Sequence, residues 1–245
     1  MYRTLGGPKF VRVSILIPVF QEEATVREVL ARVVACPTEA VGFEREVLVC
    51  DDGSTDGTAR AIRDFVAEGG AVRAFFHERN RGKGSAIRTL LPHATGDCVL
   101  VQDADLEYAI EDALEMLRAF ARGSDAVYGS RFLSRRWPAG MAPANFAANR
   151  ILTVAANAIY GHALTDEATC LKLVRTELLR RMNLECERFE FCPEVTAKLG
   201  RLGVPIVEVP VGYRGRGVIE GKKIGWRDGA EALATLVRHR FGAVP

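Results

Sequence analysis

Two aspartates separated by one alanine follow a short apolar run near the middle of the chain. The run predicts a buried strand, and Gln102, Asp103, Ala104 and Asp105 come at its end. Two carboxylates at the carboxyl end of a strand can hold a hard divalent cation that takes further ligands from phosphate oxygens and water. Such a cation offsets the charge that grows on a departing diphosphate. The alternative is that Asp103 and Asp105 only form a turn and cap the next helix.

Two more polar loops follow predicted strands. The loop 51–57 reads DDGSTDG, and its carboxylates and hydroxyls can hydrogen-bond a base and a ribose, while its glycines let a ligand approach the backbone. The same loop can also cap the helix that begins near Thr58. The loop 80–86 reads NRGKGSA before a helix and suits contact with phosphate or a base edge, although it lacks the Walker A spacing.

Basic residues gather in two loops of the second half of the chain. They are Arg131, Arg135 and Arg136 beside Trp137, and Arg214, Arg216, Lys222 and Lys223 before Trp226. Such groups can bind a lipid phosphate and anionic headgroups. A solvated charged face is the alternative, and we favour it for Arg135 and Arg136.

Alternating strands and helices position these loops. In the first half, strands are predicted over 12–20, 46–50, 72–77 and 98–102, and helices over 25–36, 58–68, 83–93 and 110–122. In the second half, strands are predicted over 126–130, 171–174 and 205–211, a loop over 131–143, and helices over 144–160, 191–202 and 226–241. This alternation favours an α/β, Rossmann-like domain with a mostly parallel central sheet flanked by helices.

Composition limits the classes of protein that fit. The 245 residues are 48% hydrophobic, which suits a single domain with one sizeable core. The 33 basic and 31 acidic residues nearly cancel, so nothing indicates a nucleic-acid partner. Six cysteines without a C-x-x-C pair favour reduced thiols in the cytoplasm. No signal peptide or transmembrane segment is predicted, because the most apolar stretch, 146–164, is broken by polar residues; it could still lie on a membrane surface.

Four motifs in their order and spacing resemble the family-2 glycosyltransferases with a GT-A fold. They are IPVFQEE at 17–23, DDGSTD at 51–56, NRGKG at 80–84 and QDADLEY at 102–108. Within that family the chain looks most similar to the dolichyl-phosphate or polyprenyl-phosphate mannose and glucose synthases. That similarity rests on YGSRF at 128–132, LTDEATCLK at 164–172, FEFCPE at 189–194 and EGKKI at 220–224.

The resemblance implies an inverting, metal-dependent transfer of a hexose from a GDP- or UDP-sugar to a polyprenyl or dolichyl phosphate. It implies a nucleotide-sugar-binding half, 1–125, and an acceptor-binding half, 126–245, in a single GT-A domain. The implied donor site comprises Pro18, Phe20, Glu22, Asp52, Lys83, Gln102, Asp103, Ala104 and Asp105, with Mg²⁺ or Mn²⁺ held by Asp103 and Asp105. Arg131, Arg214, Arg216 and Lys222 would face the acceptor or phosphate, the last three on a loop that covers the site.

Asp166 and Glu167 are the candidate catalytic carboxylates, together with Arg131. In relatives whose acceptor is a hydroxyl, a carboxylate in this region acts as general base. A lipid phosphate, with its second pKa of about 6, is largely dianionic at neutral pH and can attack unaided, which would leave Asp166 to orient the sugar or act indirectly on the metal shell. A cap for a helix near Ala168 is the structural alternative.

Three alternatives stay open at the level of sequence. The acceptor could be a soluble glycan or natural product, or the chain could be a catalytically idle nucleotide-binding subunit. Many relatives continue into membrane helices, so peripheral contact with the inner face of a membrane, or a separate membrane subunit, is a third expectation. Phe20 and Gln21 replace a Tyr-Asn pair that is common in the family, which leaves the preferred base undecided.

Overall fold

The computed structural model describes residues 11–215 and 226–241. In this part of the chain, seven strands form one sheet in the order β3-β2-β1-β4-β6-β5-β7. The strands are β1 Val11–Val19, β2 Phe43–Asp51, β3 Arg73–Phe76, β4 Cys98–Val101, β5 Ala126–Ser130, β6 Lys172–Arg175 and β7 Ile206–Pro210. β6 runs antiparallel to both of its neighbours, and every other pairing is parallel. The predicted mostly parallel sheet is therefore confirmed.

The central strand β1 owes its position to an unbroken apolar run. Residues from Val13 to Val19 are all buried, as expected of a strand that is covered on both faces and paired on both edges. Its register places Pro18 opposite Cys50 and Val19 opposite Asp51, so β1 and β2 end together. The loops that follow the two strands therefore emerge side by side.

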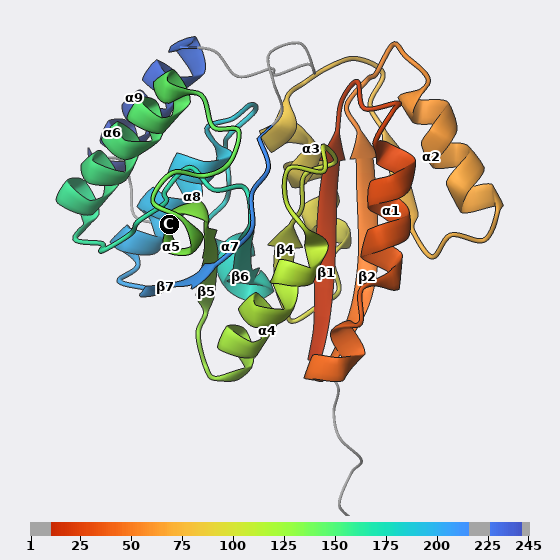
Figure 1. Cartoon of the computed structure of the whole chain (residues 1–245), viewed down its shortest axis with the longest axis horizontal. Coiled ribbons are helices and arrows are strands. Elements are labelled where there is room, and N and C mark those ends of the chain that lie inside the picture. The colour runs from red at the N-terminus through yellow and green to blue at the C-terminus, as the bar shows by residue number, and fades with distance from the viewer. Residues whose placement is uncertain (1–10, 216–225, 242–245) are drawn as a thin grey trace, which may run out of the picture.

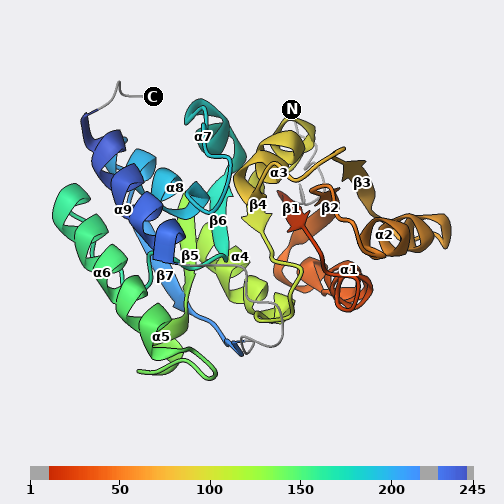
Figure 2. The ribbon, with the colours of Figure 1, turned by 90° about the horizontal axis from the view of Figure 1, so that it is seen from above.

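Helices cover both faces of the sheet (Figure 1). On one face α1 Val26–Ala35, α2 Thr58–Ala67 and α4 Ala113–Ala121 build the larger apolar cluster. On the other face α3 Lys83–Leu90, α7 Thr176–Arg181 and α8 Phe191–Arg201 build the second cluster. The remaining α-helices are α5 Arg131–Ser134, α6 Pro143–Tyr160 and α9 Trp226–Phe241. The helices α6 and α9 lie side by side and pack on α8 around Leu152, Ala197 and Leu236 (Figure 2).

The structure differs from the predicted elements in several places, of which the following three concern α-helices. The predicted helix 83–93 divides into α3 and a 3₁₀ turn, Leu91–His93, because Pro92 has no backbone N–H to continue the α-helical pattern. The predicted loop 131–143 begins with the short helix α5, whose first turn is capped by the Ser130 hydroxyl. The helix α7 was not predicted, since its six residues are too few to show a helical period.

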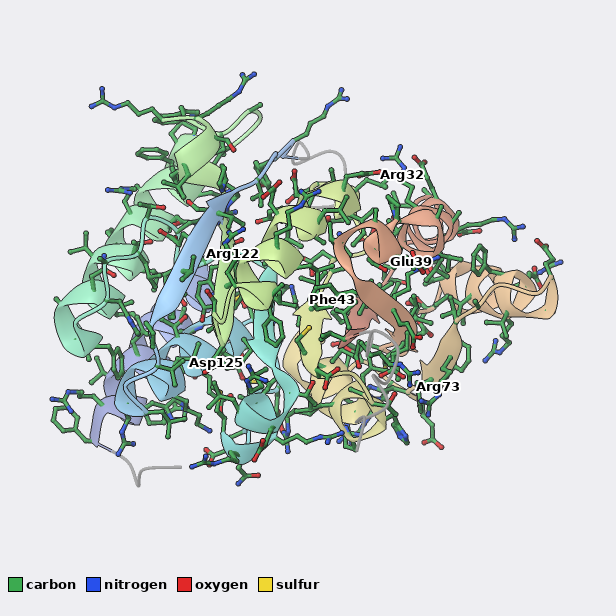
Figure 3. All side chains as sticks on the ribbon, turned by 90° about the horizontal axis from the view of Figure 1, so that it is seen from below. Arg32, Glu39, Phe43, Arg73, Arg122 and Asp125 are labelled. Carbon is green, nitrogen blue, oxygen red and sulfur yellow. The ribbon has the colours of Figure 1, made fainter. Side chains whose placement is uncertain are left out.

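The edge where the parallel strands begin is distinct from the edge that carries the predicted site. Phe43 and Arg73 begin β2 and β3, and Arg122 and Asp125 lie in the connection from α4 to β5, as the view from below shows (Figure 3). The polar loops of the sequence lie at the opposite edge, where β1, β2 and β4 end. Among the described helices, none is both long and apolar enough to cross a membrane.

Candidate active site

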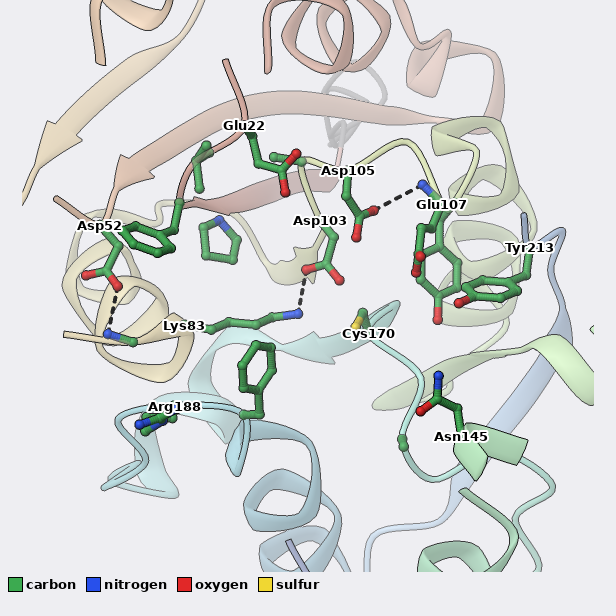
Figure 4. Close-up of a pocket in the computed structure, with 18 of the residues that line it drawn as sticks. Glu22, Asp52, Lys83, Asp103, Asp105, Glu107, Asn145, Cys170, Arg188 and Tyr213 are labelled. Carbon is green, nitrogen blue, oxygen red and sulfur yellow. Dashed lines mark hydrogen bonds and ion pairs between the residues drawn. The ribbon is translucent and has the colours of Figure 1, made fainter. Parts of the chain in front are cut away.

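A cavity of about 430 Å³ opens at the edge where β1, β2, β4 and β5 end. This is the edge where parallel α/β sheets bind ligands. The cavity is lined by loop residues after these strands, by one side of α6, by the segment before β6 and by the segment before α8. Its principal side chains appear in Figure 4. Carboxylates, one lysine and two arginines meet there with aromatic rings and three amides. Such a mixture of charged, polar and apolar groups suits a charged ligand with flat and apolar parts.

Asp52 organises the side of the cavity that lies at the end of β2. Its carboxylate accepts hydrogen bonds from Asn80 Nδ2 at 2.9 Å, Arg81 N at 2.9 Å and Gly82 N at 2.7 Å, and it lies 2.7 Å from His77 Nδ1. Four partners on one buried carboxylate fix the loop 80–82 against the end of β2. Asp52 therefore shapes the cavity wall as well as facing the cavity.

Two glycines let the loops approach each other at this wall. Gly53 has a φ of +71°, and a Cβ there would lie 2.3 Å from the Arg79 carbonyl carbon. Gly82 has a φ of +96°, and a Cβ there would lie 2.3 Å from the carbonyl oxygen of Glu187. Only glycine combines this backbone conformation with such close contacts.

Lys83 and Asp103 form an ion pair in the centre of the cavity. The Lys83 Nζ to Asp103 Oδ1 distance is 2.5 Å, and both side chains are largely buried. Burial would lower the pKa of Lys83, but the Asp103 carboxylate raises that pKa well above its usual value, so the ammonium stays charged. Asp105 also lines the cavity, and its Oδ1 accepts a hydrogen bond from Glu107 N at 3.0 Å. Asp105 therefore stabilises the predicted turn and also faces the cavity.

Arg131 and Asp166 form a second ion pair at the other end of the cavity. Arg131 Nε and one terminal nitrogen, Nη2, donate to the two carboxylate oxygens of Asp166, each at 2.7 Å, and Asn149 Nδ2 donates to Asp166 at 3.1 Å. The Arg131 guanidinium also lies 5.2 Å from the ring centre of Tyr213. Burial would raise the pKa of Asp166, but Arg131 and the hydrogen bonds to the carboxylate lower it, so the group is ionised.

Glu208 on β7 holds the chain segment that carries Asp166. Its carboxylate accepts hydrogen bonds from Thr165 N at 2.7 Å, Thr165 Oγ1 at 2.8 Å and Asp166 N at 3.0 Å. The neighbouring Glu167 points into the protein instead, where Thr196 Oγ1 donates to its carboxylate at 3.1 Å. Burial raises the pKa of Glu167 even though the nearby Lys172 acts in the opposite direction.

Most of the predicted site residues come together in the cavity. Those that line it are Pro18, Phe20, Glu22, Asp52, Lys83, Asp103, Ala104, Asp105 and Arg131. Those that do not are Gln102, Asp166, Glu167 and Arg214. Gln102 is buried below the cavity, and Arg214 is exposed, with its backbone N–H donating to Glu107 O at 3.0 Å. Arg216, Lys222 and Lys223 lie outside the described residues, so their predicted roles stay predictions.

The placement of Asp166 leaves its catalytic role as a prediction. No helix begins at Ala168, so the predicted helix cap is wrong there; the carboxylate instead accepts a hydrogen bond from the backbone N of Arg131, at the start of α5, at 3.0 Å. The structure thus places Asp166 directly behind Arg131. A role of Glu167 as general base is likewise a prediction, and its burial away from the cavity separates it from the ligand side of the site.

Sequence reasoning missed four polar or aromatic groups of the cavity. They are Asn145, Asn149, Arg188 and Tyr213. One signal was present for the first two, because two asparagines four residues apart in an alanine-rich helix lie on one helical face. Arg188 precedes α8 and Tyr213 follows β7. Only the tertiary fold brings these two residues to the cavity.

Comparison with known proteins identifies relatives over most of the chain. The model of the family described as glycosyl transferase family 2 matches residues 14–182. An undecaprenyl-phosphate 4-deoxy-4-formamido-L-arabinose transferase of Klebsiella pneumoniae is 33% identical over 210 residues, which are 84% of this chain and 61% of that protein. The protein of the same name from Pseudomonas fluorescens is 32% identical over 187 residues, which are 74% of this chain and 52% of that protein. The chain thus spans a little over half of the length of these relatives.

Solved structures with low sequence identity share the fold. A glucosyl-3-phosphoglycerate synthase of Mycobacterium tuberculosis, in complex with Mn²⁺, UDP and glucosyl-3-phosphoglycerate, superposes with a TM-score of 0.68 at 21% identity, covering 94% of this chain and 80% of that one. A mannosyltransferase of Pyrobaculum calidifontis, in complex with GDP-mannose and Mn²⁺, gives 0.64 at 24% identity, covering 97% and 67%. These similarities confirm the expected fold.

Proposed function

Because this chain belongs to glycosyl transferase family 2, we propose that it moves a hexose from a GDP- or UDP-linked donor to a polyprenyl phosphate, inverting the anomeric carbon. The observation that carries this proposal is one cavity that the aspartate pair and Arg131 line together. The transferases that the chain resembles are named for an undecaprenyl-phosphate substrate, which supports a lipid phosphate as acceptor.

The donor side of the proposal rests on the first half of the chain. Pro18, Phe20 and Asp52 would enclose the base and ribose, and Lys83 would face the diphosphate. Residues 1–125 would therefore form the donor-binding half of a single domain. The two ring-bearing side chains at the end of β1 provide flat apolar contact of the kind that a base requires.

Asp103 and Asp105 would hold the Mg²⁺ or Mn²⁺ ion of the reaction. Both carboxylates line the cavity, and oxygen ligands of this kind match hard divalent cations. No group of three or more protein ligands for a metal is present among the described residues, so phosphate and water would complete the shell. When bound, the ion would stabilise negative charge on the leaving diphosphate. Lys83 already supplies a positive charge at the same position.

The acceptor side rests on Arg131. Its guanidinium reaches the cavity while Asp166 holds it from behind, so a phosphate in the cavity would meet an oriented cation. A phosphate acceptor is its own nucleophile at neutral pH and needs no general base. We therefore assign Asp166 as a positioning residue for Arg131. Residues 126–245 would form the acceptor-binding half.

The metal and donor roles are tested by nucleotide binding. Thermal shift of the purified chain with UDP- and GDP-sugars, each with and without Mn²⁺, should show a selective, Mn²⁺-dependent stabilisation. Asp105→Ala should abolish the Mn²⁺-dependent part, whereas Asp64→Ala, at an exposed position on α2, should retain it. Unchanged binding and turnover in Asp105→Ala would refute the proposed metal role.

The acceptor is tested by transfer assays with matched substrates. A radiolabelled donor should yield product with a short-chain polyprenyl phosphate but not with the corresponding polyprenyl alcohol. Preferential turnover of a soluble glycan would instead assign the chain to the hydroxyl-acceptor class. Donor binding without any transfer to a panel of both acceptor types would identify an idle nucleotide-binding subunit.

We further propose that the surface of α5, α6 and the loop between them contacts the inner face of an anionic membrane, where a lipid phosphate would be found. Leu133, Trp137, Ile151 and Val154 expose 47–61% of their surface there. The Trp137 ring stacks on Phe146 at 4.1 Å, and Arg150 lies 5.7 Å from the ring centre of Phe132, which makes the surface continuous. Arg150 would supply positive charge that attracts anionic headgroups, and the exposed Arg135 and Arg136, for which the sequence alone favours a solvated face, would add to it.

Vesicle sedimentation tests this surface. The chain should sediment with vesicles containing phosphatidylglycerol more than with pure phosphatidylcholine vesicles, and Ile151→Glu with Val154→Glu should reduce the bound fraction. Val66→Glu, an exposed apolar position on α2, is the matched control and should bind as the unaltered chain does. Equal sedimentation of both variants would contradict membrane contact through α6.

A further inference from the structure

The segment 185–188, which precedes α8, is anchored at its start by a buried carboxylate. Glu194, in the first turn of α8, is 1% exposed. Its two oxygens accept hydrogen bonds from Glu185 N at 2.8 Å and from Cys186 N at 2.7 Å. Lys198, one turn further along α8, pairs with the same carboxylate. The start of the segment is therefore fixed to α8.

The first turn of α3 anchors the end of the same segment. Gly84 N donates to the carbonyl oxygen of Arg188 at 3.0 Å, and Ser85 N donates to that of Glu187 at 2.9 Å. Backbone N–H groups at the start of a helix can bind phosphate, but these two already have protein partners. They hold the backbone of Arg188 in place instead.

The Arg188 side chain lines the cavity, and its donors are available to a ligand. A guanidinium carries five N–H donors in one plane. Within residues 11–215 and 226–241, its only ion pair is with Asp228 on α9, at an Nη2–Oδ1 distance of 3.7 Å, which is too long for a hydrogen bond. The side chain is 69% exposed. A nucleotide in the cavity would therefore meet a cation that can still donate hydrogen bonds.

The Asp52 carboxylate, in contrast, is already occupied by the protein. A carboxylate has about four lone-pair positions. Oδ1 of Asp52 is within hydrogen-bonding distance of His77 Nδ1 and Arg81 N. Oδ2 accepts from Asn80 Nδ2 and Gly82 N. A base next to Asp52 would thus contact this wall without finding an acceptor on its carboxylate, so another side chain must distinguish one base from another.

Arg188 lies at the end of the cavity where we propose that the base binds. Its backbone is hydrogen-bonded to the start of α3, and the Lys83 side chain extends from that helix start to Asp103. In Figure 4, Arg188 lies toward the side of Asp52 and away from Asp105. Because the diphosphate is proposed to bind at Asp103 and Asp105, the part of the donor nearest to Arg188 would be the base.

We propose that Arg188 selects the base of the donor by donating hydrogen bonds to a carbonyl oxygen on the base edge, an inference that rests on the proposed donor site. The planar set of N–H groups matches acceptors such as O4 of uracil, or O6 and N7 of guanine. Adenine and cytosine carry an amino group at the corresponding position. Its hydrogens would face the donors of the guanidinium. We therefore expect uracil or guanine to be preferred over adenine and cytosine.

Calorimetric titration with UDP, GDP, ADP and CDP, each in the presence of Mn²⁺, tests this assignment. The better ligand of UDP and GDP should bind the unaltered chain about tenfold more tightly than ADP or CDP. Arg188→Gln should remove this preference, mainly by weakening the better ligand. Arg188→Lys keeps the charge but not the planar set of donors, so it should also lose the preference. Both variants should fold normally, because the anchoring contacts of Arg188 use its backbone.

Arg60→Gln is the matched control for Arg188→Gln. Arg60 is 87% exposed on α2, pairs with Asp64 at 3.6 Å and does not line the cavity, so its substitution should leave all four affinities unchanged. Equal weakening of the four nucleotides in Arg188→Gln would show contact with the shared ribose diphosphate and overturn the base assignment, while donor binding stands. Unchanged affinities in Arg188→Gln would also overturn it. If the unaltered chain binds none of the four, the proposed donor site itself fails, and the inference fails with it.

Discussion

The Arg131 guanidinium and the Asp166 carboxylate form a bidentate ion pair at the boundary between the cavity and the protein interior, with two N–O distances of 2.7 Å. Arg131 faces the cavity, whereas Asp166 is fully buried and is fixed by Asn149 and by the segment that Glu208 holds. The side chain that would meet a phosphate is therefore oriented by residues that do not touch the ligand.

Asp166→Asn should destabilise the fold and misplace Arg131. The substitution leaves a mostly buried guanidinium without its charge partner, which costs about 3 kcal/mol. Urea unfolding measures this change. Asp125→Asn is the matched control, because its ion pair with Arg175 is half exposed and such pairs contribute about 0 to 1 kcal/mol. Equal stability of the two variants would contradict a structural role of the buried pair.

Glu167→Gln should flatten the dependence of stability on pH. Burial raises the pKa of Glu167 in the folded state above its unfolded value of about 4.3. Its contribution to stability is therefore present below pH 4.3 or so and is lost as the pH rises through the folded pKa. Unfolding free energies measured from pH 4 to 8 should fall less steeply in Glu167→Gln than in the unaltered chain. Parallel curves would show that Glu167 does not titrate differently on folding.

Lys83→Met should strengthen cation binding in the absence of nucleotide. The Lys83 ammonium is charged and occupies one oxygen of Asp103, so an entering Mn²⁺ meets a competing positive charge. We expect about tenfold tighter Mn²⁺ binding by titration calorimetry, equivalent to about 1.4 kcal/mol, together with weaker binding of the nucleotide diphosphate.

Lys198→Met is the control for Lys83→Met. Lys198 is equally buried and paired, with Glu194 at 2.5 Å, but it does not line the cavity. Its substitution should leave Mn²⁺ affinity unchanged. Unchanged affinity in Lys83→Met as well would show that the cation does not use Asp103.

Gly53→Ala should destabilise the chain more than Gly69→Ala does. Both glycines have positive φ, at +71° and +91°, so the two variants share the backbone strain. Only at Gly53 does the added Cβ meet another backbone, 2.3 Å from the Arg79 carbonyl carbon, whereas nothing lies within 4 Å of it at Gly69. We expect Gly53→Ala to lose about 1 to 3 kcal/mol more in urea unfolding, and equal losses would argue against close approach of the two loops.

The part of the site around Asp52 and Asp103 could be predicted because its residues follow parallel strands. The apolar runs of β1, β2 and β4 are visible in the sequence, and strands that run in one direction end at one edge. The polar residues after them, Asp52 and Asp103 among them, therefore had to meet. The local sequence was sufficient to predict that these residues lie close together.

The part of the site around Arg131 could be predicted only in part because it depends on contacts between distant segments. Four residues, Lys172–Arg175, form β6, and nothing in so short a run indicates that it enters the sheet antiparallel. The pairing of Arg131 with Asp166 and the support from Glu208 follow from that reversal. Asn145 and Asn149 face the cavity because α6 packs on α8, which the helical period alone does not specify.

The reversed direction of β6 gives the two halves of the cavity different freedom to change. The loops that carry Asp52 and Asp103 begin where strands leave the sheet. The segment 164–171 reaches the same edge just before β6 enters the sheet in the opposite direction. With the donor bound as proposed at Asp52 and Asp103, substitutions or insertions in the segment 164–171 would change which acceptor fits without moving a donor-binding loop. Relatives that bind the same donor but differ in acceptor would then differ mainly in the segment that precedes β6.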